Sequence, residues 1–201
     1  MSQLSRRVSL VTFVTVLSAC GAQAQEPTLK SATPTLNSTK TNPDALVLQD
    51  FRQRVDKYVE LHKQAAKKSP PLKQTNDSAK IKAAQQVLAD TIQSARKDAK
   101  AGDIFTPEIR KKLKQLMYPE LKGPDGAKTK AVIKEDAPTG VPLKVNAHYP
   151  EAQPLSTVPP NLLERLPRLP AQVEYRIAGK HLLLRDVDAN LIVDFIPNAI
   201  R

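Results

Sequence analysis

The fold is decided by the stretch Val173-Glu174-Tyr175-Arg176-Ile177-Ala178-Gly179-Lys180-His181-Leu182-Leu183-Leu184-Arg185-Asp186-Val187-Asp188-Ala189-Asn190-Leu191-Ile192-Val193-Asp194-Phe195-Ile196. Its β-branched and apolar runs are interrupted by residues that favour tight turns, at 178–180 and 187–189. This pattern predicts three short antiparallel strands at about 173–178, 181–186 and 190–196.

The segment before these strands is rich in proline. Prolines at 150, 154, 159, 160, 167 and 170 leave room only for a one-turn helix at about 161–166. Leu143, Val145 and Ala147 alternate with polar residues, which predicts a half-buried strand there. Residues 141–201 are therefore expected to form a proline-rich segment followed by a β-meander.

Residues 44–118 have a helical period instead. Apolar residues return every three or four positions from Val47 to His62, which predicts a helix at about 45–67 beginning at Asp44. A second helix should begin at Asn76 or Asp77 and end at Gly102, forming a hairpin with the first. Thr106-Pro107-Glu108 is a typical helix start, so a third helix is expected at about 107–118.

Glycine and proline pairs dominate residues 119–140, which we therefore expect to be an exposed linker with a short strand at 131–134. The chain as a whole is predicted to have an α+β fold, with a helical N-terminal half beside a small antiparallel sheet.

The N-terminus has the features of an export signal. Arg6 and Arg7 precede an apolar run, Val8 to Ala19, that is too short for a permanent membrane anchor. Leu17-Ser18-Ala19-Cys20 resembles a lipoprotein cleavage site, in which Cys20 would be lipidated, whereas Ala22-Gln23-Ala24 would direct cleavage before Gln25. Both interpretations stand, so residues 1–24 are expected to contain a signal peptide that is cleaved before Cys20 or before Gln25. Residues 25–43 are rich in Thr, Ser, Pro and Asn and are expected to be a disordered tether.

The net positive charge of the chain indicates which binding partners are suitable. Loss of Arg6 and Arg7 leaves 29 basic and 20 acidic residues, a net charge near +9, and residues 50–100 hold twelve Lys/Arg against six Asp/Glu. In an envelope such a surface would meet lipid head groups or acidic polymers. Nucleic acid is a poor candidate because aromatic residues for base stacking are scarce. The expected basic surface is formed by Arg52, Arg54, Lys57, Lys63, Lys67 and Lys68.

The C-terminal stretch carries a resemblance. Tyr175-Arg176-x-x-Gly179, an apolar strand, Asp186 and Ile192-Val193-Asp194-x-Ile196 resemble the C-terminal hairpin of small bacterial envelope proteins of unknown function. The stretch is also similar to the RcnB-type periplasmic proteins linked to nickel and cobalt homeostasis. It covers about a quarter of the mature chain and is carried by strand and turn residues, which predict shape better than chemistry.

Catalytic signals are weak. The chain has no nucleophile elbow, no phosphate-binding glycine loop and no spaced cysteine set. Asp186-Val187-Asp188-Ala189-Asn190 mimics the start of a calcium loop, but Leu191 replaces its glycine and Pro197 its glutamate, so a self-capped turn is favoured. His148 and His181 are weak candidates for metal ligands, and Asp186 with Asp194 is a weak candidate for a hydrolytic pair.

These observations predict an exported envelope protein that acts as a non-catalytic binding or structural module and needs no cofactor. The alternatives are a periplasmic metal-responsive protein and a hydrolase of cell-wall polymer. The predicted location is the periplasm or, through lipidated Cys20, the outer membrane.

Overall fold

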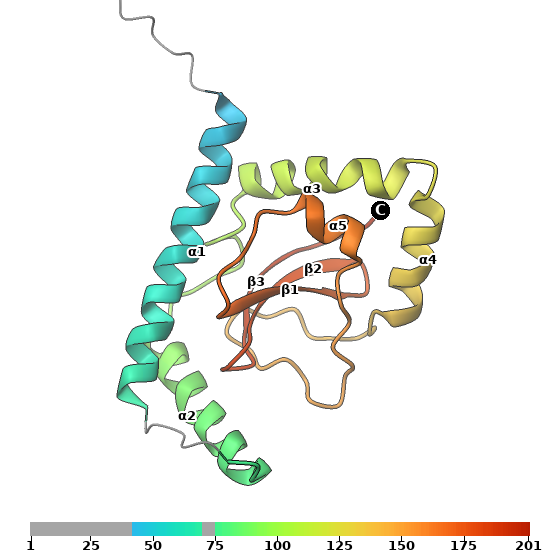
Figure 1. Ribbon diagram of the computed structural model, residues 1–201. Coiled ribbons are helices and arrows are strands. Elements are labelled where there is room, and N and C mark those ends of the chain that lie inside the picture. The colour runs from blue at the N-terminus through green and yellow to red at the C-terminus, as the bar shows by residue number, and fades with distance from the viewer. Residues whose placement is uncertain (1–41, 70–74) are drawn as a thin grey trace, which may run out of the picture. The chain divides into compact units, whose positions relative to one another are not determined.

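The computed structural model describes residues 42–69 and 75–201, which belong to one compact unit. The predicted signal region, Cys20 and nearly all of the predicted tether lie outside the described residues. The elements, in chain order, are α1 (Pro43–Lys68), α2 (Ser78–Ala95), α3 (Pro107–Lys122), α4 (Gly126–Asp136), α5 (Pro160–Arg165), β1 (Val173–Ala178), β2 (His181–Asp186) and β3 (Ile192–Ile196) (Figure 1). The predicted α+β fold is confirmed.

The three strands form one antiparallel sheet in the order β1-β2-β3. Ala178 pairs with His181 across the first turn, and Leu184 pairs with Asp194 between β2 and β3. The register shifts between Leu184 and Arg185, as a β-bulge does. Val193 is the extra residue of this bulge, because Leu184 pairs with Asp194 and Arg185 with Ile192. As a result, Val193 joins the main core, and its neighbour Asp194 accepts a hydrogen bond from the connection between α2 and α3.

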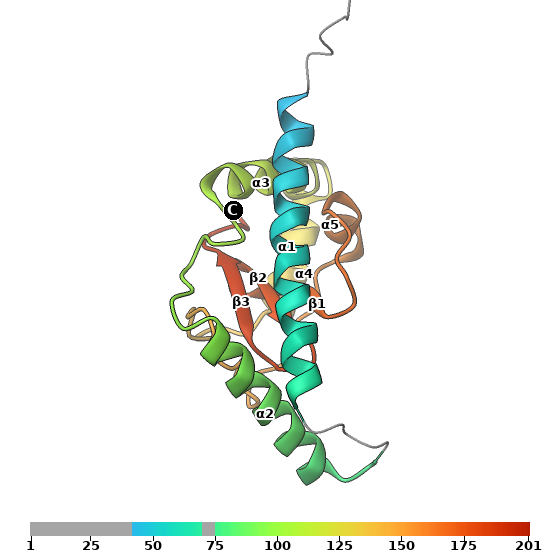
Figure 2. The same cartoon turned by 90° about the vertical axis from the view of Figure 1, so that its left-hand side faces the viewer.

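One core joins the helices to the sheet. Phe51 of α1 stacks on Phe105 with ring centroids 5.8 Å apart. The same cluster contains Ile109, Leu113 and Met117 of α3 and Ile177, Leu182 and Leu184 of the sheet, all almost completely buried. Figure 2 shows α1 lying across one side of the strands. The helical and β parts therefore stabilise each other through shared apolar burial.

A second, smaller core lies on the other face of the sheet. Tyr149 and Val141 cover Leu183 and Ile192 there. The strand predicted from Leu143 to Ala147 is absent. Asn146 has a positive φ of 62°, and pairing is limited to an isolated bridge between His148 and Leu191. The segment hydrogen-bonds to the start of β3, from the Asn146 amide to the Ile192 carbonyl at 2.8 Å and from the Ile192 amide to the Ala147 carbonyl at 2.9 Å, but it does not form a regular strand.

The prediction of an exposed linker at 119–140 was wrong. Helix α3 continues through Pro119 to Lys122, and α4 occupies the region where a strand was expected. Leu121 and Ile133 are each 4% exposed, so burial in the core outweighs the local cost of proline in a helix. Gly126 permits the tight turn between the two helices, because a Cβ there would lie 2.4 Å from the Leu121 carbonyl oxygen.

The ends of the first two helices also differ from the prediction. Asn42, not Asp44, caps α1, and its side chain accepts a hydrogen bond from the Asp44 amide at 3.0 Å. Asp77 caps α2 as expected. Helix α2 ends at Ala95 rather than Gly102, and Ile81 in its first turn is 43% exposed. Asp194 of β3 binds the connection between α2 and α3, which keeps this stretch out of the helix.

The structure of α4 generates a direct test. Ile133→Ala should lower the free energy of unfolding by about 2–4 kcal/mol, because it removes a buried side chain. Val132→Ala, one residue away on the exposed side, should change it by less than about 1 kcal/mol. Chemical denaturation monitored by circular dichroism measures both. Equal, small effects would indicate that residues 126–136 do not pack on the core.

Candidate functional site

The most polar interior region surrounds Asp186 at the end of β2. Its carboxylate is fully buried and accepts hydrogen bonds from the Tyr58 hydroxyl at 2.6 Å and from the Ala189 amide at 2.7 Å. The Nδ1 atom of His62 lies 2.7 Å from the same carboxylate. Tyr58 and His62 are one turn apart on α1, so this cluster joins the middle of the helix to the sheet.

His62 lies between two carboxylates. Its Nε2 atom is 3.4 Å from Asp188, whose side chain is 61% exposed, while the His62 side chain is only 5% exposed. The hydrogen bond with Asp186 raises the pKa of His62; burial opposes this, and the negative charges of Asp186 and Asp188 add to it. An imidazolium can donate to both carboxylates. Burial, followed by the charge of Asp186, raises the pKa of Tyr58, which keeps its hydroxyl a donor.

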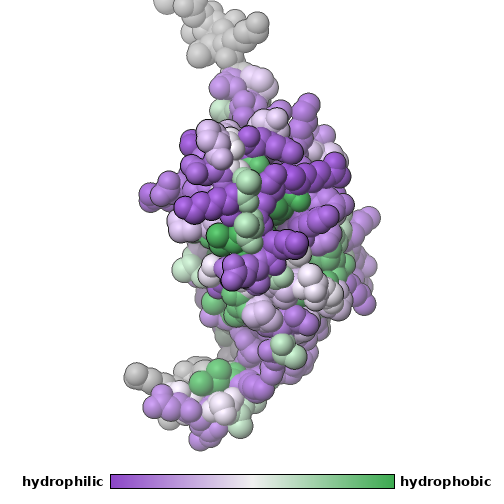
Figure 3. Space-filling model, turned by 90° about the vertical axis from the view of Figure 1, so that its right-hand side faces the viewer, coloured by the Kyte–Doolittle hydropathy of each residue, from purple (hydrophilic) through white to green (hydrophobic). Residues whose placement is uncertain are grey.

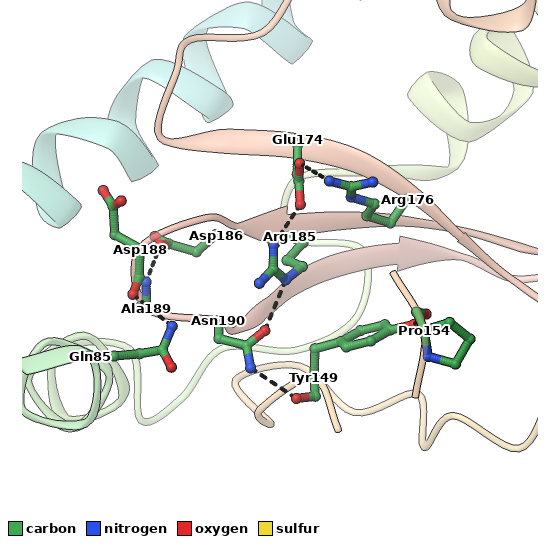
Figure 4. Close-up of polar contacts among 10 residues, drawn as sticks. All are labelled: Gln85, Tyr149, Pro154, Glu174, Arg176, Arg185, Asp186, Asp188, Ala189 and Asn190. Carbon is green, nitrogen blue, oxygen red and sulfur yellow. Dashed lines mark hydrogen bonds and ion pairs between the residues drawn. The ribbon is translucent and has the colours of Figure 1, made fainter. Parts of the chain in front are cut away.

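The turn after β2 holds this cluster in place. Asp186 caps it through the Ala189 amide, and Asn190 adopts a positive φ of 52°. Figure 4 shows Asp188 at the outside of the turn, with Asn190 between Arg185 and Tyr149. The predicted self-capped turn is therefore confirmed.

Asp194 forms a second buried anchor. Its carboxylate accepts hydrogen bonds from the backbone amides of Gly102, Ile104 and Phe105 at 3.0, 2.9 and 2.8 Å. Gly102 has a φ of 102°, a conformation that glycine adopts without strain. These bonds fix the connection between α2 and α3, which explains why α2 does not continue to Gly102.

Asp186 and Asp194, the two carboxylates that were candidates for hydrolysis, thus both accept hydrogen bonds from donors inside the protein. Neither carboxylate lines any of the described pockets. The charged residues that line those pockets lie outside β2 and β3. A hydrolytic pair needs one carboxyl group free to meet a substrate. The arrangement of Asp186 and Asp194 suits cross-linking of the fold.

An open groove of about 740 Å³ lies between α5 and β1. Its walls are mainly apolar and include Leu163, Leu166 and Val173. Leu166 is buried, whereas Leu163 is 49% exposed. The groove also meets Glu174 and Arg176, a pair with a 2.6 Å contact.

Glu174 lies between two arginines on the face of the sheet away from α1 (Figure 4). Burial would raise its pKa, but the hydrogen bonds from Arg176 and Arg185 outweigh burial and lower it. Glu174 is thus a charged partner for two cations, which is a structural arrangement rather than that of a general acid.

A second hollow, of about 450 Å³, lies between α1 and the end of α2 and contains the cations Arg54, Lys57 and Arg96. Arg54 binds Asp50 and the carbonyl of Asp103. Arg96 binds Asn146 and lies 4.9 Å from the centre of the Tyr58 ring. Two of its three cations are therefore held by internal partners.

The structure places the two histidines proposed as metal ligands in different surroundings. His148 lies 3.5 Å from the Gln86 amide on α2, and His181 accepts a hydrogen bond from the Asn198 amide. Within residues 42–69 and 75–201, no group of three or more His, Cys, Asp or Glu side chains is arranged to hold a metal ion. The histidine with carboxylate partners is His62, which the sequence placed on the apolar face of its helix without indicating those partners.

The predicted basic surface lies on α1. Lys57, Lys63, Lys67, Lys68 and Arg52 are exposed, whereas Arg54 is half-buried in its ion pair with Asp50. Asp56 and Glu60 lie on the same exposed side, and Glu60 binds Lys63 at 2.8 Å. The charge of α1 is therefore mixed along its length.

Helix α3 carries basic residues that sequence analysis did not single out. Lys111, Lys114 and Lys122 share its outer side with Tyr118, which is 61% exposed. In Figure 3, hydrophilic residues dominate the visible side of the molecule, and hydrophobic groups appear between them as separate small patches. The spacing of three and four residues between these side chains is the sequence pattern that could have indicated that they share one side of α3.

Comparison with protein-family models, with curated proteins and with solved structures found no match to this chain. None of the helices of the described residues has the length and apolar character needed to cross a membrane.

Removal of the second anchor should destabilise the protein. Asp194→Asn replaces a carboxylate that accepts hydrogen bonds from four backbone amides, those of Gly102, Ile104, Phe105 and Phe195, by a group with one acceptor oxygen, and should lower the free energy of unfolding by about 2–4 kcal/mol. The matched change Asp188→Asn, on an exposed side chain, should cost less than about 1 kcal/mol. Urea denaturation compares them, and equal costs would contradict the anchoring role.

The His62 cluster should make stability depend on pH. The pKa of His62 is raised in the folded protein, so its protonated form stabilises the fold below the unfolded pKa of about 6.5, and this contribution is lost as pH rises through the folded pKa. The difference in unfolding free energy between about pH 6 and about pH 9 should shrink in His62→Gln.

His181→Gln is the control, because burial lowers the pKa of His181 and its contribution has the opposite sign. Denaturation of each variant at both pH values measures the effect. An unchanged pH dependence in His62→Gln would show that His62 does not link protonation to folding.

Proposed function

We propose that this chain is an exported bacterial envelope protein that acts as a non-catalytic binding or structural module. The observation that carries the proposal is the distribution of charge. The buried carboxylates Asp186 and Asp194 are bound by internal donors, whereas lysines lie exposed on α1 and α3. The chemistry available to a partner is therefore a set of surface cations on a rigid scaffold.

Such a surface fits the acidic groups of an envelope. The contacts proposed on α1 are Lys57, Lys63, Lys67, Lys68 and Arg52, with Arg54 contributing less because Asp50 binds it. Lipid phosphates and acidic polymers carry the complementary charge at high local density. Nucleic acid is a weaker candidate, since Tyr118 is the one strongly exposed aromatic side chain of the described residues.

Export rests on the N-terminal sequence. Arg6 and Arg7, the apolar run and Cys20 support either a lipid-anchored protein of the outer membrane or, after cleavage before Gln25, a soluble protein of the periplasm. The resemblance to small envelope proteins points to the same compartment. The metal-responsive and hydrolytic alternatives gain no specific support from the side-chain geometry described above.

The proposal is tested by the mature N-terminus. Mass spectrometry of the protein isolated from a cell-envelope fraction should find either an acylated Cys20 or a free Gln25. In the acylated case, Cys20→Ser should abolish the lipid mass and release the protein from membranes, while Ser18→Ala, a neighbouring change that keeps a small residue, should preserve both. Unprocessed protein with Met1 in the cytosol would contradict export.

A further inference from the structure

The outer side of α3 is a continuous basic face. It consists of Lys111, Lys114, Gln115, Tyr118 and Lys122, which recur at spacings of three and four residues and therefore align along the helix. The opposite side is buried through Ile109, Leu113, Met117 and Leu121. We call the five outer residues the α3 face.

Between Lys111 and Lys122 no acidic residue lies on the α3 face, and Glu108, which is exposed one turn before Lys111, lies on the same side at the start of the helix. Glu120 is directed toward α5, where it binds Arg165 and Asn161. Lys112, on the side of α3 next to α1, binds Asp44 at 2.6 Å. The ion pairs of the described residues include none of Lys111, Lys114 and Lys122. This sets the α3 face apart from α1, whose exposed side mixes both signs of charge.

Further cations surround Lys114. Burial lowers the pKa of Lys114, and the positive charges of Arg201 and Arg110 lower it further. The Lys114 ammonium donates a hydrogen bond to the Pro197 carbonyl, which holds it beside the C-terminal segment. An anionic partner would offset these positive charges.

Tyr118 gives the face an apolar component. With Lys111, Lys114 and Gln115 it lines a shallow hollow of about 340 Å³. Lysine stems and a tyrosine ring present apolar carbon near the protein and polar groups at their tips. That combination matches the boundary between head groups and acyl chains better than it matches a soluble, fully polar polymer.

The position of α3 fits the same partner. Figures 1 and 2 both show α3 toward the end of the unit where α1 begins, and the Lys112–Asp44 pair joins the first turn of α1 to α3. Twenty-one residues lie between Cys20 and Asn42. Under the proposed lipidation, the membrane would therefore be attached to the chain at the end that carries α3.

We propose that the α3 face binds the anionic head groups of a phospholipid bilayer, with the lysines on lipid phosphates and Tyr118 at the head-group boundary. This inference rests on the proposed export to the envelope. A basic patch adds electrostatic attraction to anionic lipids beside the lipid anchor. The same contact would draw the soluble form to the membrane surface.

Vesicle binding tests the proposal. The chain beginning at Gln25 retains the whole core, whose buried residues lie between Phe51 and Ile200, and contains no acyl group. It should sediment with vesicles of phosphatidylglycerol and phosphatidylcholine at about 0.1 M salt, and far less with phosphatidylcholine alone. The triple change Lys111→Gln, Lys114→Gln and Lys122→Gln should weaken binding at least about tenfold.

The matched control is Lys57→Gln, Lys63→Gln and Lys67→Gln on α1, which removes the same charge and should weaken binding less than about threefold. Tyr118→Ala should weaken binding, and Tyr118→Trp should retain it. Circular dichroism and thermal unfolding establish that each variant is folded.

Absence of binding to the anionic vesicles, or equal losses in the two triple variants, would overturn the proposal. Displacement of the protein from vesicles by lower concentrations of a soluble teichoic acid would assign the face to polymer instead. None of these outcomes bears on export, which the mature N-terminus decides separately.

Discussion

The structure depends on two carboxylates that project from the sheet into the interior between sheet and helices. Asp186 holds α1 through Tyr58 and His62, and Asp194 holds the connection between α2 and α3 through three backbone amides. Burying a carboxylate without hydrogen-bond donors would be costly. These two residues therefore constrain the helices to positions in which the carboxylate oxygens receive hydrogen bonds. Apolar burial drives the association of the two layers, and the carboxylates select one arrangement of them. The β-bulge at Leu184/Arg185 is part of this selection, because it allows Asp194 to face the connection.

The same arrangement shapes what the protein can offer to others. Side chains that would attract attention as catalytic groups, His62, Asp186 and Asp194, are used inside the fold. The groups left on the outside are chiefly lysines of α1 and α3, with Tyr118 among them. The described surface carries exposed acids as well as bases, but the lysines of α1 and α3 give it cations that can contact acidic surfaces, which supports the proposed role at the envelope.

The sequence predicted the sheet well and the interior badly. The strands at 173–178 and 181–186 have the predicted bounds, because turn residues and alternating side chains are local signals. Helix α4 was missed because the turn pairs around Gly123 and Gly126 indicate a loop, whereas burial of Ile133 in the core outweighs them. Asp186 and Asp194 are 128 and 89 residues from their partners Tyr58 and Phe105, and no pattern in a single sequence encodes such pairs. The lysines of α3 recur at helical spacing, which a single sequence contains, but their exposure depends on how α3 packs in the fold.

The most direct test of this account is hydrogen exchange of the backbone amides of Gly102, Ile104 and Phe105, measured by NMR in the native protein. These amides lie in an irregular connection, where exchange is normally fast. If Asp194 anchors the connection, Ile104 and Phe105 should exchange only through global unfolding, with the same free energy as Leu184 in the central strand. Exchange through local opening, with protection several kcal/mol below that of Leu184, would contradict the central role of the buried carboxylates.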